Sequence, residues 1–136
     1  MQTETLVDFR FLRLRIWKES VKLGSGLLDV ATRLRADRDF ALADQLMRAA
    51  LSRSNNIAEG AGSYSAQEFA YFLNVARRSA FENASMIVLL RIRGRLTEKE
   101  ATRLLARLYR LSRRISALRD SVRSARPRRR ASKRNV

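Results

Sequence analysis

Four arginines recur three or four residues apart on one predicted helix, and they are the side chains best suited to binding chemistry. On an α-helix these spacings bring side chains to one face, where like charges repel. No acidic residue lies between Arg103 and Arg119 to offset them. Because guanidinium groups pair bidentately with phosphate, the pattern predicts an anionic partner. Acidic groups from another helix or subunit, or a plainly solvated face, are the alternatives. This arginine stripe consists of Arg103, Arg107, Arg110 and Arg114.

The C-terminal segment supplies a second set of candidate phosphate ligands. Residues 123–136 contain seven basic and no acidic residues, in a chain whose formal net charge is +16. Few of these side chains are apolar, so we expect residues 124–136 to form a disordered basic tail. Neutralising phosphates releases counterions, which favours a polyphosphate partner. A solvated tail kept for solubility is the alternative. The candidate residues are Arg126, Arg128, Arg129, Arg130, Lys133 and Arg134.

Polar residues on the facing sides of the second and third predicted helices form another group. Its two glutamates could suggest a metal site or an acid–base pair. The di-iron bundle pattern, however, needs two Glu-x-x-His motifs, and this chain has no histidine. We therefore interpret the group as a structural polar layer that fixes helix register or contacts another subunit. Its members are Asn56, Glu59, Ser79, Glu82 and Asn83.

The composition argues against catalysis. The chain has no cysteine and no histidine, which excludes disulfides, cysteine-based zinc sites, thiol nucleophiles and the usual neutral-pH general base. We predict a protein that is not an enzyme and that needs no cofactor or metal. A carboxylate–metal site at Glu59 and Glu82 is the remaining enzymatic alternative.

Four helical segments with apolar stripes of helical period are expected to position these side chains. The fourth has the clearest stripe, from Leu104 to Val122 in alternating steps of four and three residues. The short connections favour antiparallel neighbours, so the prediction is an all-α, antiparallel up-down four-helix bundle. The helices are expected at about 9–34, 39–59, 65–93 and 97–123. The chain would then consist of an N-terminal extension (residues 1–8), the four-helix bundle (9–123) and the disordered basic tail (124–136).

Local signals mark the ends of these helices. Asp39 is an N-cap candidate, and Ser65-Ala66-Gln67-Glu68 and Thr97-Glu98-Lys99-Glu100 are capping boxes. Gly60 and Gly94 are expected to stand just beyond the C-terminal ends of the second and third helices. No apolar run reaches the length of a membrane span, and the acidic N-terminus lacks a secretory signal pattern. We expect a cytoplasmic protein without a membrane partner.

Aromatic residues are few, with six Phe, three Tyr and one Trp. Most of the phenylalanines fall on apolar stripes, which places them in the core. Tyr64 and Tyr71 are the candidates for exposure. The sequence therefore predicts no aromatic platform for stacking bases.

Several motifs together resemble the four-helix-bundle family of 23S rRNA-intervening-sequence proteins. The similarity extends over about residues 9–122. The motifs are Arg15-Ile16-Trp17-Lys18, Gln45-Leu46-Met47-Arg48-Ala49-Ala50, Asn56-Ile57-Ala58-Glu59-Gly60 and Gln67-Glu68-Phe69-Ala70-Tyr71-Phe72-Leu73. The resemblance implies a homopentameric barrel of antiparallel four-helix bundles. It also implies similarity to the accessory variability determinant of diversity-generating retroelements, a basic pentamer that binds nucleic acid and its reverse transcriptase.

Two departures from the family pattern stand out. A Ser-Ile-Pro-like step is replaced by Ser52-Arg53-Ser54-Asn55. A Gly-Ser-x-x-Glu-x-Glu pattern becomes Arg78-Ser79-Ala80-Phe81-Glu82-Asn83-Ala84, which retains Ser79 and Glu82 but loses the glycine and the second glutamate. A polar site that uses both glutamates is thereby put in doubt.

The composition, the arginine pattern and the resemblance together predict a non-catalytic homo-oligomer. The number of five subunits is implied by the resemblance alone. The predicted partner is nucleic acid, RNA in preference to DNA, held through arginine–phosphate contacts without base specificity. The alternative is a protein–protein scaffold or accessory subunit for a nucleic-acid-associated partner, such as a polymerase or a ribosomal component.

Overall fold

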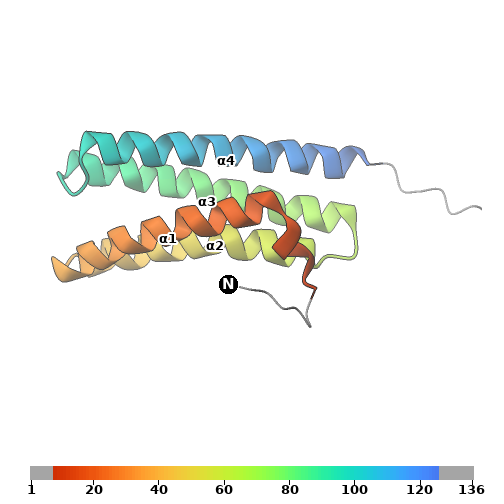
Figure 1. The fold of residues 1–136 in the computed structure, drawn as a ribbon, viewed down its shortest axis with the longest axis horizontal. Coiled ribbons are helices and arrows are strands. Elements are labelled where there is room, and N and C mark those ends of the chain that lie inside the picture. The colour runs from red at the N-terminus through yellow and green to blue at the C-terminus, as the bar shows by residue number, and fades with distance from the viewer. Residues whose placement is uncertain (1–7, 126–136) are drawn as a thin grey trace, which may run out of the picture.

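The computed structural model describes residues 8–125 and contains four α-helices with no strand in that range. A short 3-10 turn precedes them (Figure 1). The elements are η1 (Arg10–Arg13), α1 (Arg15–Ala36), α2 (Phe40–Ala61), α3 (Ala66–Ile92) and α4 (Glu98–Ser124). The all-α prediction is confirmed. None of these helices is long and apolar enough to cross a membrane.

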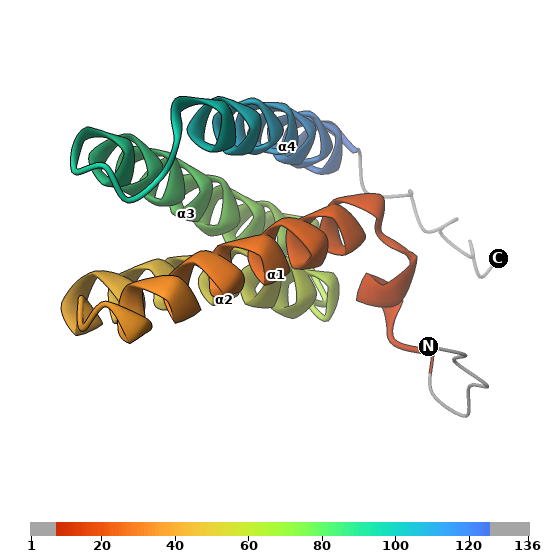
Figure 2. The same cartoon turned by 60° about the vertical axis from the view of Figure 1, so that its left-hand side comes forward.

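The four helices lie side by side, with the connecting turns at alternate ends of the molecule (Figure 1). Extensive contacts join α1 to α2, α2 to α3, and α3 to α4, and of the four neighbouring helix pairs α1 and α4 contact one another least. In Figure 2, α4 lies beside α3, and α1 lies beside α2. The bundle is therefore closed least tightly between α1 and α4, which is where the arginine stripe lies.

The apolar stripe of α4 enters the core as its periodicity predicts. Leu104, Leu108, Leu111 and Ile115 are buried, and Leu118 and Val122 pack against the core while partly exposed. Each buried aliphatic side chain of this size contributes about 1.5–3 kcal/mol through removal from water. This seam holds α4 against the other helices and presents the neighbouring arginines to the α1 side.

Of the three predicted N-terminal caps, the Thr97 capping box is complete, the Ser65 box forms one of its two bonds, and Asp39 stands at the N-cap of α2 without a side-chain capping hydrogen bond. The Ser65 hydroxyl accepts a hydrogen bond from the Glu68 backbone N–H at 3.1 Å. At the start of α4, Thr97 and Glu100 exchange both hydrogen bonds of a capping box. Gly94 follows α3 with φ +72°, a left-handed conformation that glycine adopts without a steric penalty.

The first helix begins later than predicted. Leu14 has an extended backbone, which separates the 3-10 turn from α1. Phe9 is 56% exposed rather than part of a core stripe, and its ring stacks on Phe11 at 5.5 Å between centroids. Phe11 in turn contacts Trp17 at 4.8 Å. Through Phe11, this aromatic cluster reaches Trp17, which packs against the bundle core.

Gly60 was predicted to stand just beyond the end of α2, but the helix continues to Ala61. The prediction was wrong at this position. A Cβ atom built on Gly60 would lie 2.8 Å from the Phe72 Cβ and 3.0 Å from the Phe69 Cδ2. The first distance is shorter than a Cβ atom can tolerate and the second is tight, so the neighbouring side chains or helices would have to shift. Gly60 is therefore needed for the close approach of α2 and α3, and not for a turn.

We expect the Gly60→Ala variant to lose about 1–3 kcal/mol of unfolding free energy, because overpacking outweighs the gain in helix propensity. Gly26→Ala is the matched control, since its Cβ would meet nothing within 4 Å inside α1. That control should gain about 0.5–1 kcal/mol. Urea unfolding followed by circular dichroism measures both, and an equal gain for the two variants would contradict the close-approach role.

Candidate nucleic-acid interface

The structure brings the whole arginine stripe to the α1 side of α4. Arg107 is half-buried, and Arg103, Arg110 and Arg114 are exposed. They line two hollows between α1 and α4, of about 100 and 210 Å³, and Arg107 borders both. Guanidinium groups in shallow hollows can reach phosphate oxygens while their stems rest on the apolar residues beneath.

One stripe arginine is already paired within the chain. Arg114 Nη1 lies 2.5 Å from the Glu19 Oε1, and Arg15 Nε donates to the same oxygen at 2.8 Å. Burial alone would raise the pKa of Glu19, but the hydrogen bonds from Arg114 and Arg15 lower it below its ordinary value. An acidic group from another helix thus engages the stripe, as one of the sequence alternatives proposed, and within residues 8–125 it does so at this one position.

The other three stripe arginines form no ion pair with a carboxylate of the described residues. Asp29 and Glu100 line the larger hollow, but the Glu100 carboxylate lies 3.4 Å from Arg33 on α1. Within residues 8–125, the charges of Arg103, Arg107 and Arg110 are therefore available to an external anion.

We expect Glu19→Gln to tighten nucleic-acid binding, because it releases Arg114 and removes a negative charge from the hollow. The salt dependence should steepen by about 0.7–0.9 on a plot of log affinity against log salt concentration, as for one added phosphate contact. Asp44→Asn is the control: it removes the partner of Arg35 at the α1–α2 contact. Fluorescence anisotropy measures the affinity of both variants. If Asp44→Asn tightens binding as much as Glu19→Gln does, the gain comes from net charge and not from the release of Arg114.

Glu19 also gives the stability of the fold a pH dependence of known sign. Its folded-state pKa is lowered, so its ion pairs stabilise the protein above the unfolded-state pKa of about 4.3. That contribution disappears as the pH falls through the folded-state pKa. It is absent from the Glu19→Gln variant.

A buried arginine that the sequence analysis did not select lies at the centre of the bundle. Arg53 of α2 has no exposed surface. Its Nε donates to the Ser20 Oγ at 2.8 Å, its Nη1 to the Asn83 Oδ1 at 2.6 Å, and its Nη2 to the Ser20 backbone oxygen at 3.0 Å. Among the residues that the structure describes, no carboxylate pairs with it. The replacement of a Ser-Ile-Pro-like step by Ser52-Arg53-Ser54 was the signal that could have identified it.

The environment of Arg53 opposes its charge. Burial, and secondarily the positive charge of Arg107, lowers the pKa of Arg53 to about 10. The side chain still remains protonated at neutral pH. Arg53 is therefore a buried cation with no carboxylate partner among residues 8–125, and it lies close enough to Arg107 for the two positive charges to repel.

The predicted polar layer divides into separate parts. Asn83 belongs to the Arg53 cluster. Asn56 donates to the Ser52 Oγ at 3.0 Å, and that hydroxyl lies 3.1 Å from the Ser79 Oγ, which links α2 to α3. These contacts agree with a structural role.

Glu59 and Glu82 do not belong to this layer. Both side chains are exposed and form no hydrogen bond or ion pair with the described residues, because they lie on the outward sides of α2 and α3. Within residues 8–125, no three acidic side chains gather as metal ligands. The predicted layer was wrong at these two positions.

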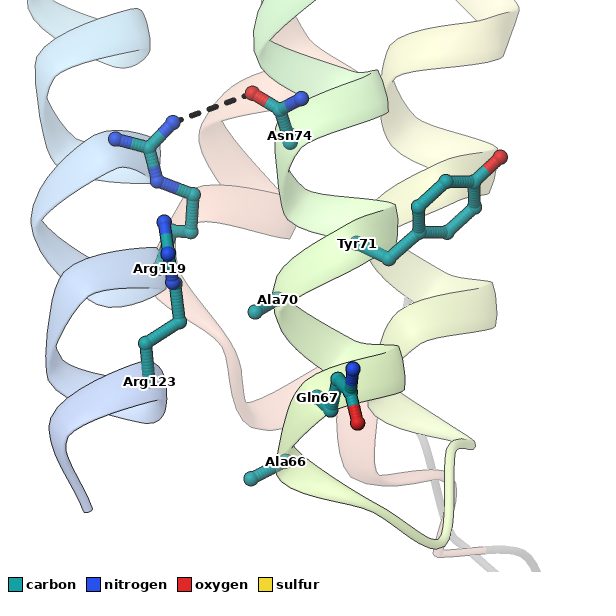
Figure 3. A pocket seen from close by; sticks show the side chains of 7 residues that line it. All are labelled: Ala66, Gln67, Ala70, Tyr71, Asn74, Arg119 and Arg123. Carbon is teal, nitrogen blue, oxygen red and sulfur yellow. Dashed lines mark hydrogen bonds between the residues drawn. The ribbon is translucent and has the colours of Figure 1, made fainter.

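A hollow of about 590 Å³ lies between the start of α3 and the end of α4. Figure 3 shows Arg119 extending from α4 to Asn74 of α3, whereas the Arg123 side chain runs along α4 towards Arg119; Ala66 and Ala70 line the opposite side of the hollow. Arg119 Nη1 donates to the Asn74 Oδ1 at 3.2 Å. No carboxylate of residues 8–125 lines this hollow, so it is a second arginine-bearing surface, one that the spacing of the arginines in the sequence did not predict.

The cationic tail candidates lie outside the described residues. They are Arg126, Arg128, Arg129, Arg130, Lys133 and Arg134. Arg123, which lines the hollow in Figure 3, is the last arginine before them in the described range.

Exposed aromatic residues are more numerous than predicted. Tyr64 and Tyr71 are exposed, as expected, but Phe81 is 54% and Tyr109 62% exposed. Both line hollows between α3 and α4. The expectation that most phenylalanines lie in the core was therefore wrong: of the six, Phe69 alone is buried, and Phe9, Phe40 and Phe81 are exposed.

Comparison with known proteins agrees with the fold and with the motifs. The family model described as 23S rRNA-intervening sequence protein matches residues 13–117, which include α1, α2, α3 and most of α4. A search of curated proteins finds no match. A match over this much of the chain shows that it belongs to the 23S rRNA-intervening sequence protein family.

Proposed function

We propose that this protein is a non-catalytic, basic, antiparallel four-helix bundle that assembles as a homo-oligomer and binds nucleic acid. The proposed ligand is RNA in preference to DNA, held through arginine–phosphate contacts without base specificity. The observation that carries the proposal is the row of Arg103, Arg107 and Arg110, which line the hollows between α1 and α4. None of the three is paired with a carboxylate of residues 8–125.

The electrostatic setting supports an anionic partner. A protein whose arginines serve only solubility would gain by mixing charges of both signs along the helix face, whereas α4 has no acid between Arg103 and Arg119. The buried charge of Arg53 acts on Arg107 and adds to the positive potential. A phosphate bound at the stripe would relieve repulsion among these cations. The family name, which refers to an rRNA intervening sequence, is consistent with RNA as that partner.

The apolar surface of α3 supports assembly. Val88, Leu89 and Ile92 are all exposed near the end of this helix. A helix with apolar residues on several faces is usually covered by other elements, and a second copy of the chain would provide the cover. The pentameric number comes from the family resemblance. Assembly would repeat the arginine stripe on each subunit, so weak phosphate contacts would combine into tight binding.

The stripe is tested by replacing Arg103, Arg107 and Arg110 with glutamine. We expect affinity for a single-stranded RNA to fall about 10-fold to 100-fold at low salt, with the log–log salt slope shallower by about 2. The matched control replaces Arg48, Arg78 and Lys99 with glutamine, three exposed residues that line none of these hollows. This control variant removes the same three positive charges as the stripe variant. If both variants lose affinity equally, the binding depends on net charge and not on the stripe.

A scaffold for a nucleic-acid-associated protein is the second candidate, and the same exposed residues of α3 favour it. Copurification after nuclease treatment distinguishes the two functions. A partner protein that is retained when RNA and DNA have been digested would support the scaffold, whereas loss of all partners on digestion would support nucleic-acid binding.

A further inference from the structure

A third surface, also between α3 and α4, combines arginines with exposed aromatic rings. The guanidinium carbon of Arg77 lies 4.8 Å from the ring centroid of Phe81, on α3. On α4, the guanidinium carbon of Arg113 lies 5.8 Å from the centroid of Tyr109, and Arg113 Nη1 donates to the Tyr109 hydroxyl at 3.3 Å. In each pair the two residues are four positions apart, so they share one helix face. We call the space between these pairs the outer groove.

The outer groove consists of two adjoining hollows that share Phe81, Tyr109 and Ser112. One has a volume of about 240 Å³ and is lined by alanine and leucine besides the two rings. The other, of about 410 Å³, adds Arg77 and Arg113. An apolar, aromatic-lined space thus adjoins a cationic one, which is the combination that a nucleotide requires for its base and its phosphate.

The charges of the outer groove are largely unopposed. Asp120 is the one carboxylate that lines it within the described chain, and it accepts hydrogen bonds from Arg119 Nε at 3.3 Å and Nη2 at 3.2 Å. Neither Arg77 nor Arg113 forms an ion pair with a carboxylate of the described residues. More than half of the surface of Phe81 and of Tyr109 remains exposed. Burial in the core therefore does not explain why these two positions carry aromatic residues.

We propose that the outer groove binds an unpaired segment of a nucleic-acid strand. The rings of Phe81 and Tyr109 stack on its bases, and Arg77 and Arg113 pair with its phosphates. This inference rests on the proposed function and specifies its substrate, because a duplex keeps its bases stacked and out of reach. Stacking is tolerant of sequence, since every base has a π-face.

Charge favours a nucleic-acid strand over a second copy of the chain in this groove. The formal net charge of each copy is +16, so a second copy would bring further cations towards Arg77 and Arg113. A phosphodiester strand brings one negative charge with each nucleotide. Nearer the C-terminal end of α4, the same helix pair also forms the hollow lined by Arg119 and Arg123 (Figure 3), which could supply further phosphate ligands.

The test compares affinities for a single-stranded RNA and a duplex RNA of equal length, using the full chain. The variant is Phe81→Leu/Tyr109→Leu, which keeps apolar area but removes both π-faces. We expect its affinity for the single strand to fall at least about 10-fold, with the salt slope and the duplex affinity unchanged. The control is Phe40→Leu/Tyr64→Leu, which removes two exposed aromatic rings elsewhere, and it should bind both RNAs like the parent protein.

The outcomes separate this inference from the proposed function. If the parent protein binds neither RNA, the proposed function fails, and the inference fails with it. If the parent binds RNA but the groove variant binds the single strand with unchanged affinity, only the inference is overturned. A groove variant whose assembly mass falls while its affinity per subunit is retained would also overturn it, because the groove would then be a contact between copies.

Discussion

An Asn83→Leu variant should lose about 3 kcal/mol of unfolding free energy, although leucine is a better helix former than asparagine. Asn83 is fully buried, and its Oδ1 is the acceptor for Arg53 Nη1 at 2.6 Å. Leucine would leave that charged donor without a partner where water does not reach it. Urea unfolding followed by circular dichroism measures the loss. Asn55→Leu, an exposed position on α2, is the control and should change stability by less than about 0.5 kcal/mol.

The double variant Arg53→Ile/Asn83→Leu should recover the lost stability and reach or exceed that of the parent protein. Replacing a buried polar group and its partner together by apolar side chains is often neutral or stabilising by about 1–4 kcal/mol. Here it removes a cation whose pKa burial has lowered to about 10. The Ser20 hydroxyl can then bond within its own helix. If the two single effects simply add, Arg53 and Asn83 are not coupled and this account of the core is wrong.

Removal of residues 126–136 should produce the largest change in nucleic-acid binding. The segment carries six cations and no acid. If each contacts one phosphate of a single strand, the log–log salt slope becomes shallower by about 4, and affinity at about 50 mM salt falls by a factor of 100 or more. Anisotropy titrations at several salt concentrations measure both quantities.

Two full-length controls separate charge from chain length in this experiment. Glutamine at all six cationic positions should reproduce the deletion, whereas lysine at the five arginine positions should retain most of the salt slope, because it preserves charge. An unchanged slope after deletion would show that residues 126–136 do not contact phosphate. Binding would then depend on the arginine stripe and the outer groove alone.

The features that could be predicted from the sequence are those with local causes. The stripe of α4 follows from spacing alone, so the burial of Leu104, Leu108 and Leu111 was foreseeable. The capping box at Thr97 and Glu100 involves residues three apart, and it too was predicted correctly. The common face of the arginine stripe follows from the same helical geometry.

The features that could not be predicted depend on contacts between helices. Gly60 resembles a helix terminator in the sequence, and only its distances to Phe69 and Phe72 reveal a close approach of α2 and α3. A charged residue such as Arg53 is expected at the surface until Ser20 and Asn83 are seen beside it. The outer groove likewise arises because α3 and α4 place two i,i+4 aromatic–arginine pairs opposite one another.

The central claim, that this protein binds nucleic acid through phosphate contacts, is tested most directly by the affinity of the nuclease-treated full chain for RNA between about 50 and 200 mM salt. The account predicts tight binding at the lower concentration and a linear fall of log affinity with log salt, by about three orders of magnitude or more across the range if six or more phosphates are contacted. Absence of binding at low salt, or binding insensitive to salt, would contradict it.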